Sequence, residues 1–226
     1  CFFFFKTADD EELLKVVSAG QKAVNYENNQ QINQPNNQEK PRQYSQNSNA
    51  NNANKSKPDM NIGGVSSWIK AARNIADKVN SLEGLRDEVE NFDGLSIKKT
   101  ATNCVFAEGN PQADIMLIGE APGANEDMEG RPFCGVSGQL MDKMFSYAGY
   151  TRKENLYITN TIFWRPPGNR KPTQEETDIC KPLLERHISF INPKAIILVG
   201  GTATSVVLND KTSVSKLRKL EHKYFN

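Results

Sequence analysis

The chain has 226 residues, and its 28 lysines and arginines nearly balance its 27 aspartates and glutamates, which leaves a net charge of +1. That length suits one domain of ordinary size with additional segments. The small net charge gives no overall positive field, so any binding to nucleic acid has to come from a local patch, and no apolar run approaches the roughly 20 residues of a membrane helix.

The first 65 residues form two segments. Residues 1–25 begin with CFFFFK, which has no basic stretch before it and no clear cleavage site after it, so it is a poor signal peptide. Asp9 to Val24 can form a short amphipathic helix. Residues 26–65 are rich in Asn and Gln and carry too little apolar surface to offset the entropy of ordering. We expect a disordered linker there, acting as a spacer or an interaction tail, and a folded domain over residues 66–226.

Two helices are predicted at the start of this domain. Apolar residues spaced four or three apart form one helical stripe through Trp68, Ala72, Ile75, Val79 and Leu82. Ser81 and Gly84 then indicate a break, and a second helix continues through Leu85, Val89 and Phe92. We expect both helices to cover the outside of a core, with binding of a partner as the alternative.

From Ala113 the chain alternates short apolar runs with helical segments. The runs DIMLIGE, NLYITN and KAIILVGG each end in Gly or a polar residue, which is typical of buried parallel strands. A helix is predicted over residues 136–148, with an apolar face of Leu140, Met141, Met144 and Tyr147. Another helix begins at a capping box of Thr173 and Glu176. Its residues expected to face the core are Ile179, Leu183, Leu184 and Ile188. The alternation predicts an α/β sandwich in which right-handed crossovers place all strand ends at one edge.

Polar residues follow each predicted strand, at the edge where ligands bind in such folds. Gly119 and Glu120 end the first strand, Asn160 ends the second, and GGTAT follows the third. The Asn160 amide offers both a donor and an acceptor, which suits the edge of a pyrimidine, and Phe133 in GRPF could stack on its face. A stiff loop that suits phosphate contacts carries Arg165, Arg170 and Lys171.

Each of these residues also has a purely structural explanation. Glu120 could cap a helix, Asn160 could form a turn, and Phe133 could pack in the core. The basic loop could be an ordinary solvated surface. For Trp164, which begins that loop, we expect a place in the core rather than in the groove.

The cysteines stand at wide, irregular spacings without a CxxC pair: Cys1, Cys104, Cys134 and Cys180. This spacing predicts neither a disulfide framework nor a zinc site. We expect reduced thiols, each a small buried side chain, in a cytoplasmic protein.

Four long motifs resemble the type-4 uracil-DNA glycosylases of the uracil-DNA glycosylase superfamily: GEAPGANED, GRPFCGVSGQLMDKM, YITNTIFWRPPGNRKPTQEE and INPKAIILVGGTA. The resemblance covers roughly residues 92–218. It implies a three-layer α/β/α sandwich with a short, four-stranded parallel sheet. It also implies hydrolysis of the N-glycosidic bond of uracil in DNA, which leaves an abasic site for base excision repair. We expect a monomer that acts on uracil-containing DNA, single- or double-stranded, and not at a membrane.

By motif position, the resemblance implies that Gly119, Glu120 and Ala121 border the uracil, that Phe133 stacks on it and that Asn160 reads its Watson–Crick edge. The base has to be flipped out of the duplex into this pocket. Departure of uracil leaves positive charge on the sugar, which a nearby carboxylate stabilises. Glu120 is the candidate for that catalytic carboxylate, with Glu126 and Asp127 as alternatives.

The first departure from the family concerns its [4Fe-4S] cluster, which four cysteines hold. Three of these positions fall on Phe92, Leu95 and Trp164, and only Cys180 matches. One thiolate cannot hold a cluster that needs about four, so we predict no metal and no cofactor.

The second departure concerns a later His-Pro motif whose His donates to the uracil carbonyl. Here the sequence reads SVSKLRKLEHKYFN, in which Lys and Tyr follow His222. We therefore expect the fourth strand of the family to be missing. Loss of one such donor typically costs on the order of 10²–10³ in rate. The missing strand would also expose an edge of the sheet. We therefore expect weak activity or none, with a DNA-binding or polymerase-associated relative that kept only the fold as the alternative. A different nucleotide-binding protein is disfavoured, because neither GxGxxG nor GxxxxGK[ST] occurs.

Overall fold

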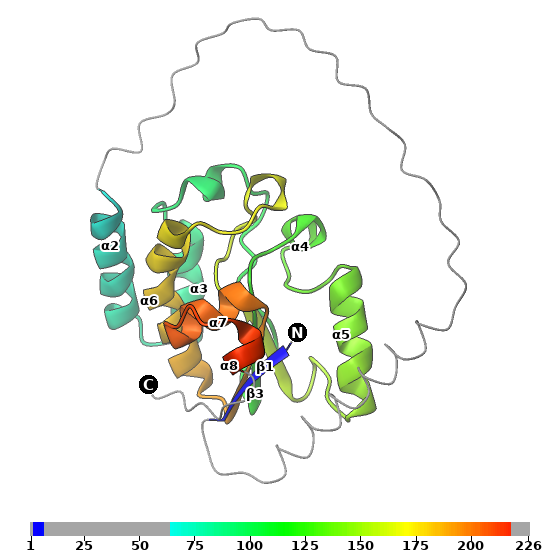
Figure 1. The fold of residues 1–226 in the computed structure, drawn as a ribbon. Helices are drawn as coiled ribbons and strands as arrows, with labels where there is room; N and C mark the ends of the chain where they lie inside the picture. The colour runs from blue at the N-terminus through cyan, green and yellow to red at the C-terminus, as the bar shows by residue number, and fades with distance from the viewer. Residues whose placement is uncertain (1, 7–63, 218–226) are drawn as a thin grey trace, which may run out of the picture.

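The computed structural model describes residues 2–6 and 64–217 (Figure 1). The predicted helix at Asp9 to Val24, nearly all of the predicted linker and His222 lie outside the described residues. Among the residues described, no helix combines the length and the apolar character needed to cross a membrane.

A five-stranded sheet with the order β1-β5-β3-β4-β2 forms the centre of the fold. The three predicted strands are confirmed as β3 (Ile115–Gly119), β4 (Leu156–Asn160) and β5 (Ala195–Val199), and β3 pairs in parallel with both neighbours. Their apolar runs are buried almost throughout because helices cover both faces of the sheet.

Two antiparallel strands border this parallel centre. β2 (Glu108–Gly109) pairs with β4. β1 (Phe2–Lys6) pairs with β5 over its whole length, from Phe2 opposite Val199 to Lys6 opposite Ala195. The prediction that the outer edge of β5 is exposed was therefore wrong, because a segment far away in the sequence supplies the backbone hydrogen bonds for it.

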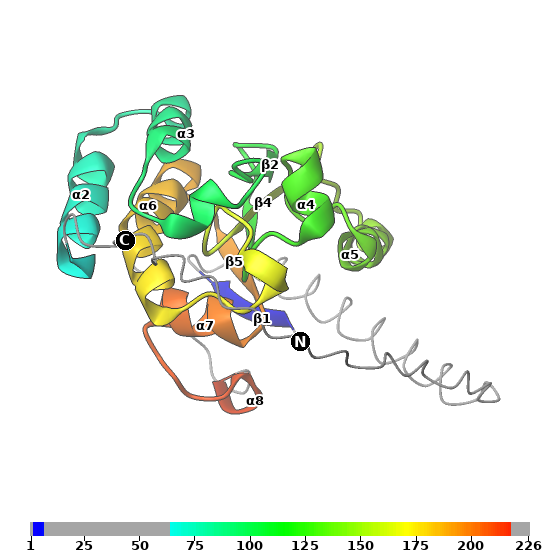
Figure 2. The ribbon, with the colours of Figure 1, turned by 90° about the horizontal axis from the view of Figure 1, so that it is seen from above.

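The helices form the two outer layers of an α/β/α sandwich, as predicted (Figures 1 and 2). They are α2 (Val65–Lys78), α3 (Leu82–Asn91), α4 (Ala124–Glu129), α5 (Val136–Tyr147), α6 (Gln174–Ile191), α7 (Gly201–Leu208) and α8 (Val214–Leu217), with two short 3₁₀ helices at Ser96–Lys99 and Pro167–Asn169. Helices α2, α3 and α6 lie on one side of the sheet and α5 lies on the other.

Alternate residues of the central strand enter different cores, as the two-residue period of a strand requires. Ile115 and Leu117 pack toward Met141 of α5. Met116 and Ile118 pack toward α6 and α7. The sheet is thus held from both sides, which fixes the position of the strand ends that carry the candidate site.

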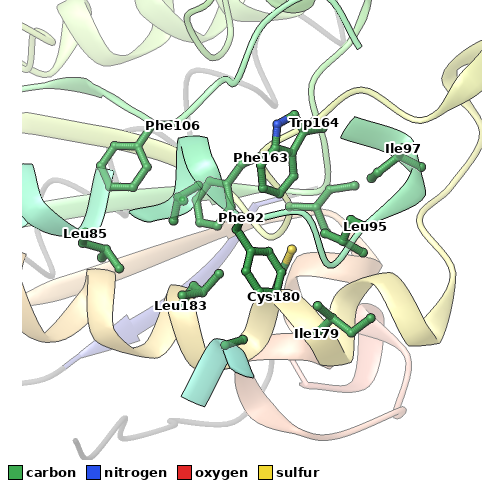
Figure 3. Close-up of a cluster of buried hydrophobic side chains, with 13 residues drawn as sticks. Leu85, Phe92, Leu95, Ile97, Phe106, Phe163, Trp164, Ile179, Cys180 and Leu183 are labelled. Atoms are coloured by element: carbon green, nitrogen blue, oxygen red, sulfur yellow. The ribbon is translucent and has the colours of Figure 1, made fainter. Parts of the chain in front are cut away.

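A third core lies beneath α2 and α3, and we call it the helical core. It contains Ala72, Leu85, Val89, Phe92, Leu95, Ile97, Phe106, Ile162, Phe163, Trp164, Ile179, Cys180 and Leu183 (Figure 3). Trp164 is 2% exposed, so its predicted place in the core is confirmed. The partly buried Trp68 packs against the same core, and its ring meets the Phe92 ring edge to face with 5.9 Å between the ring centroids.

The ends of two helices follow the predicted capping residues. The Ser81 hydroxyl accepts a hydrogen bond from the Gly84 N–H at 3.0 Å and begins α3. Thr173 and Glu176 form the predicted capping box of α6, because each side chain accepts from the backbone N–H of the other.

The predicted apolar face of α5 was wrong in part. Met141 is buried, but Leu140 is 49% exposed and Tyr147 is 82% exposed. Gly138 decides the orientation, because a Cβ built there would lie 1.7 Å from the Phe133 carbonyl oxygen. The helix therefore turns its glycine, rather than its largest side chains, toward the loop that precedes it.

Candidate active site

The ends of β3 and β4 remain joined beyond the last residue of each strand. The Thr161 N–H donates to the Gly119 carbonyl at 2.9 Å, and the Thr161 hydroxyl donates to the Glu120 carbonyl at 2.5 Å. Thr161 is fully buried. These bonds fix the first residues of both loops relative to each other, so the side chains at the strand ends have defined positions.

Gly119 is the point where two predicted site residues meet. A Cβ built on Gly119 would lie 2.5 Å from Asn160 Oδ1 and 2.6 Å from Phe133 Cε2 and Cζ. The Asn160 side chain is nearly inaccessible, since the residue is 2% exposed. An aromatic ring and an amide from distant parts of the sequence therefore converge over a residue that has no side chain.

Phe133 reaches this position with an unusual backbone. Its φ angle is +53°, in the left-handed region that residues with a Cβ rarely adopt. The ring is half-buried and packs against the core between the sheet and α5. Arg152 donates hydrogen bonds to the carbonyl oxygens of Pro132 and Phe133, so the loop is held at its backbone.

Glu120 comes directly after Gly119, and its carboxylate is oriented by a side chain from the third loop. Thr202, in the first turn of α7, donates its hydroxyl hydrogen to Glu120 Oε2 at 2.5 Å. Glu120 is half-buried. Its neighbour Ala121 packs on the other side, against the helical core.

The carboxylate of Glu126 binds the backbone of the Phe133 loop. It accepts hydrogen bonds from the N–H groups of Gly135 at 2.9 Å, Cys134 at 3.0 Å and Gly123 at 3.1 Å. Burial alone would raise the pKa of Glu126, but these hydrogen bonds lower it below its ordinary value. The position of Glu126 thus explains how the loop is tied to α4.

Asp127 binds a different stretch of backbone, at residues 102 and 103. Its Oδ1 accepts from the N–H groups of Thr102 at 2.8 Å and Asn103 at 3.1 Å, and the residue is 3% exposed. Arg165 Nη1 lies 3.9 Å from its other oxygen. Glu120 differs from these two carboxylates, because it accepts from a side-chain hydroxyl whereas they accept from backbone N–H groups.

The basic loop is only partly available to a ligand. Arg170 forms a two-bond ion pair with Glu176, at 2.8 Å and 2.6 Å. Arg165 donates to Asn169 Oδ1 at 2.6 Å, and Lys171 is exposed. The carboxylate that begins α6 therefore holds one of the three predicted cations.

Two contributors to the site were missed from the sequence, Arg152 and Thr202. Arg152 stands in the turn GYTRKEN and has the pattern of an ordinary surface charge. Thr202 lies in the GGTAT motif, which we expected at the site, but nothing in the motif indicates that its hydroxyl reaches Glu120.

Comparison of the sequence with known proteins identifies its family. Residues 106–225, more than half of the chain, match the family model described as the uracil DNA glycosylase superfamily. The chain belongs to the uracil DNA glycosylase superfamily. Three curated relatives are type-4 uracil-DNA glycosylases, from Sulfurisphaera tokodaii (38% identical), Saccharolobus solfataricus (40%) and Archaeoglobus fulgidus (37%).

Each of these three alignments covers 62% of the chain, and they span 66%, 67% and 72% of the respective relatives. The chain thus matches about two thirds of the length of these uracil DNA glycosylase superfamily members. All of the candidate site residues fall within the matched residues 106–225.

The positions where the type-4 glycosylases are expected to hold a [4Fe-4S] cluster are filled here by apolar side chains. Phe92 (5% exposed), Leu95 (3%) and Trp164 (2%) pack in the helical core around Cys180 (0%) (Figure 3). Burial raises the pKa of the Cys180 thiol, whereas a cluster binds thiolates. Within the described residues, no group of three or more His, Cys, Asp and Glu side chains could hold a metal ion. The residues present do not fit the cluster.

Proposed function

We propose that this protein hydrolyses the N-glycosidic bond of uracil in DNA and leaves an abasic site for base excision repair. The observation that carries the proposal is the convergence of Phe133 and Asn160 on Gly119. Membership of the uracil DNA glycosylase superfamily and the similarity to type-4 enzymes support the same reaction.

Recognition in this proposal divides between a ring and an amide. The flipped base enters a pocket, where base-flipping enzymes read it by stacking and by hydrogen bonds to its Watson–Crick edge. Phe133 supplies the stacking face. The Asn160 amide, which has one donor side and one acceptor side, supplies the hydrogen bonds. Gly119 leaves room for the two side chains themselves, because a Cβ there would lie 2.5 Å from Asn160 Oδ1 and 2.6 Å from the Phe133 ring.

The carboxylate of Glu120 carries the chemistry in this proposal. As uracil leaves with the electrons of the bond, the sugar becomes positively charged, and a preorganised carboxylate stabilises that charge. Water then adds to the sugar carbon and loses a proton, which completes the hydrolysis. The hydrogen bond from Thr202 orients the carboxylate before the substrate arrives. Glu126 and Asp127 hold backbone instead, which favours Glu120 over these two alternatives.

DNA is held in this proposal by the basic loop that follows β4. Arg165 and Lys171 contact phosphates of single- or double-stranded DNA, and Arg170 contributes less because Glu176 pairs with it. Phosphate contacts position the DNA without reading its sequence. Each contact adds about 0.7 to 0.9 to the slope of log affinity against log salt.

We also propose that the enzyme works without an iron–sulfur cluster. The helical core ties α2 and α3 to the rest of the domain through apolar packing around Cys180. Protein purified under anaerobic conditions should contain no iron and no sulfide and should lack absorption in the visible range. Stoichiometric iron that resists chelation would contradict this proposal.

The proposed cellular setting is the cytoplasm, with the protein acting as a monomer. The three described cysteines are free, and burial is the main cause that raises the pKa of Cys104 to about 12 and that of Cys134 to about 11. Unreactive free thiols suit a reducing compartment. Light scattering of the purified protein at several concentrations tests the monomeric state.

The test of the proposed function is release of uracil from oligonucleotides that contain one deoxyuridine, single-stranded or paired. The protein should release uracil, and Asn160→Ala should reduce the rate by at least on the order of 10²-fold, because a lost preorganised partner typically costs that much. DNA binding in a gel-shift assay without uracil release would instead support the alternative of a DNA-binding relative that kept the fold.

A further inference from the structure

Arg152 connects four groups around the loop that carries the aromatic ring. It lies in the turn between α5 and β4, and its side chain is 14% exposed. Its Nη1 donates to the Pro132 carbonyl oxygen at 2.7 Å, and its Nη2 donates to the Phe133 carbonyl oxygen. The same guanidinium pairs with Glu108 Oε2 at 2.5 Å and with Asp142 Oδ1 at 2.8 Å.

The Phe133 backbone needs such an anchor. Its φ of +53° is a sparsely populated conformation for a residue with a Cβ, and it persists only where the surroundings hold it. Gly138 packs directly against the Phe133 carbonyl, since a Cβ built there would lie 1.7 Å from the carbonyl oxygen. The hydrogen bond from Arg152 Nη2 restrains the same carbonyl, and the one from Nη1 restrains the carbonyl of Pro132.

Two oppositely charged side chains, Arg152 and Glu126, bind the backbone acceptors and the backbone donors of this loop. Arg152 binds the carbonyl oxygens of residues 132 and 133. Glu126 binds the N–H groups of residues 134 and 135. The cation thus takes the acceptors and the anion takes the donors of one short segment, and the ring between them is directed at Gly119.

We infer that Arg152 is a positioning residue, which sets the place of the Phe133 ring against the flipped uracil. The inference rests on the proposed function, because it assigns a purpose to the ring that Arg152 holds. A guanidinium is required, since its planar fork of N–H donors reaches four acceptors at once, whereas a lysine ammonium offers three donors from one point. Asp142 on α5 and Glu108 on β2 keep the fork in place.

The experiment is a double-mutant cycle between Arg152→Gln and Phe133→Ala, measured as kcat/KM and as single-turnover uracil release. Arg131→Gln is the matched control, because Arg131 also pairs with Glu108, at 3.2 Å, but is bonded to neither loop carbonyl. Arg152→Gln should lower kcat/KM about 10- to 100-fold, since a misplacement of about 1 Å can cost that much. Arg131→Gln should stay within about twofold of the parent.

The cycle separates positioning from general stability. In the Phe133→Ala background, Arg152→Gln should change kcat/KM less than about twofold, because no ring remains to be placed, although the melting temperature still falls. An equal loss in both backgrounds, or an unchanged kcat/KM in Arg152→Gln, would overturn the inference. Arg152→Lys should keep most of the defect, and it replaces the glutamine variant in the cycle if that variant does not fold.

A second readout does not depend on activity. Hydrogen exchange at the amides of Cys134 and Gly135 should be faster in Arg152→Gln than in the parent and unchanged in Arg131→Gln. Equal exchange in all three proteins would overturn the inference. A parent protein that releases no uracil would refute the proposed function instead, and the exchange comparison would still decide whether Arg152 holds the loop.

Discussion

Gly119→Ala is the most direct test of how the site is built. The added Cβ would lie 2.5 Å from Asn160 Oδ1 and 2.6 Å from two carbons of the Phe133 ring. The attraction between non-bonded carbon atoms is strongest at a separation of about 3.5–4.0 Å. Both groups therefore have to withdraw by about 1 Å, or the strand end has to shift by a similar distance.

Neither group can withdraw freely. Asn160 is 2% exposed and is the last residue of a strand that pairs with β3. Arg152 donates to the Phe133 carbonyl, and Glu126 accepts from the N–H groups of the next two residues. Overpacking of this kind typically costs about 1–3 kcal/mol of stability. A displacement of about 1 Å at a reacting centre can cost about 10²-fold in rate, so we expect a loss of that order in uracil release.

The assay is single-turnover release of uracil from a single-stranded oligonucleotide, with thermal unfolding measured alongside. Gly64→Ala is the control, because a Cβ there meets no atom within 4 Å. If Gly119→Ala kept its release rate within about threefold of the parent while remaining folded, the convergence of Asn160 and Phe133 would not be the basis of recognition.

Three further predictions concern stability and DNA binding. Burial lowers the pKa of His187 to about 3, so between pH 3 and pH 6.5 the unfolded chain binds a proton that the folded chain does not. The free energy of unfolding should therefore fall by up to about 1.4 kcal/mol per pH unit as the pH drops from 6.5 toward 3. The free energy of unfolding, measured with urea at pH 5–7, should depend less steeply on pH in His187→Phe than in the parent. An unchanged dependence on pH would contradict this prediction. Trp164→Ala should cost about 3–5 kcal/mol in urea unfolding, because the side chain is buried in the helical core, and a cost below about 1 kcal/mol would mean that this core carries little stability. Lys171→Gln should lower the salt slope of DNA binding by about 1, whereas Arg170→Gln, which loses a cation already paired with Glu176, should lower it less; equal effects would show that the ion pair opens on DNA.

The parts of the site that follow strand ends could be predicted from the sequence. Gly119 and Asn160 each end an apolar run, and parallel strands bring such ends to one edge. Phe133 stood out as an aromatic residue in a Gly- and Pro-rich loop. In each case the signal is local, because it consists of a residue type at a recognisable position in the chain.

The contacts that hold these residues depend on tertiary structure and leave no such signal. Arg152 lies 19 and 20 residues from the carbonyls it binds. Glu126 and Asp127 follow the first strand closely and were therefore candidates for the catalytic carboxylate. The sequence does not show that backbone N–H groups bind both of them. The pairing of β1 with β5 was also beyond prediction, since its partners lie at opposite ends of the chain.

Both tryptophans of the chain, Trp68 and Trp164, belong to the helical core rather than to the layer that includes α5. Intrinsic fluorescence should therefore report when α2 and α3 detach from the domain, and it should be nearly silent to rearrangement around Phe133. An emission spectrum can thus distinguish a variant that has lost its helical cover from one whose defect is confined to the pocket.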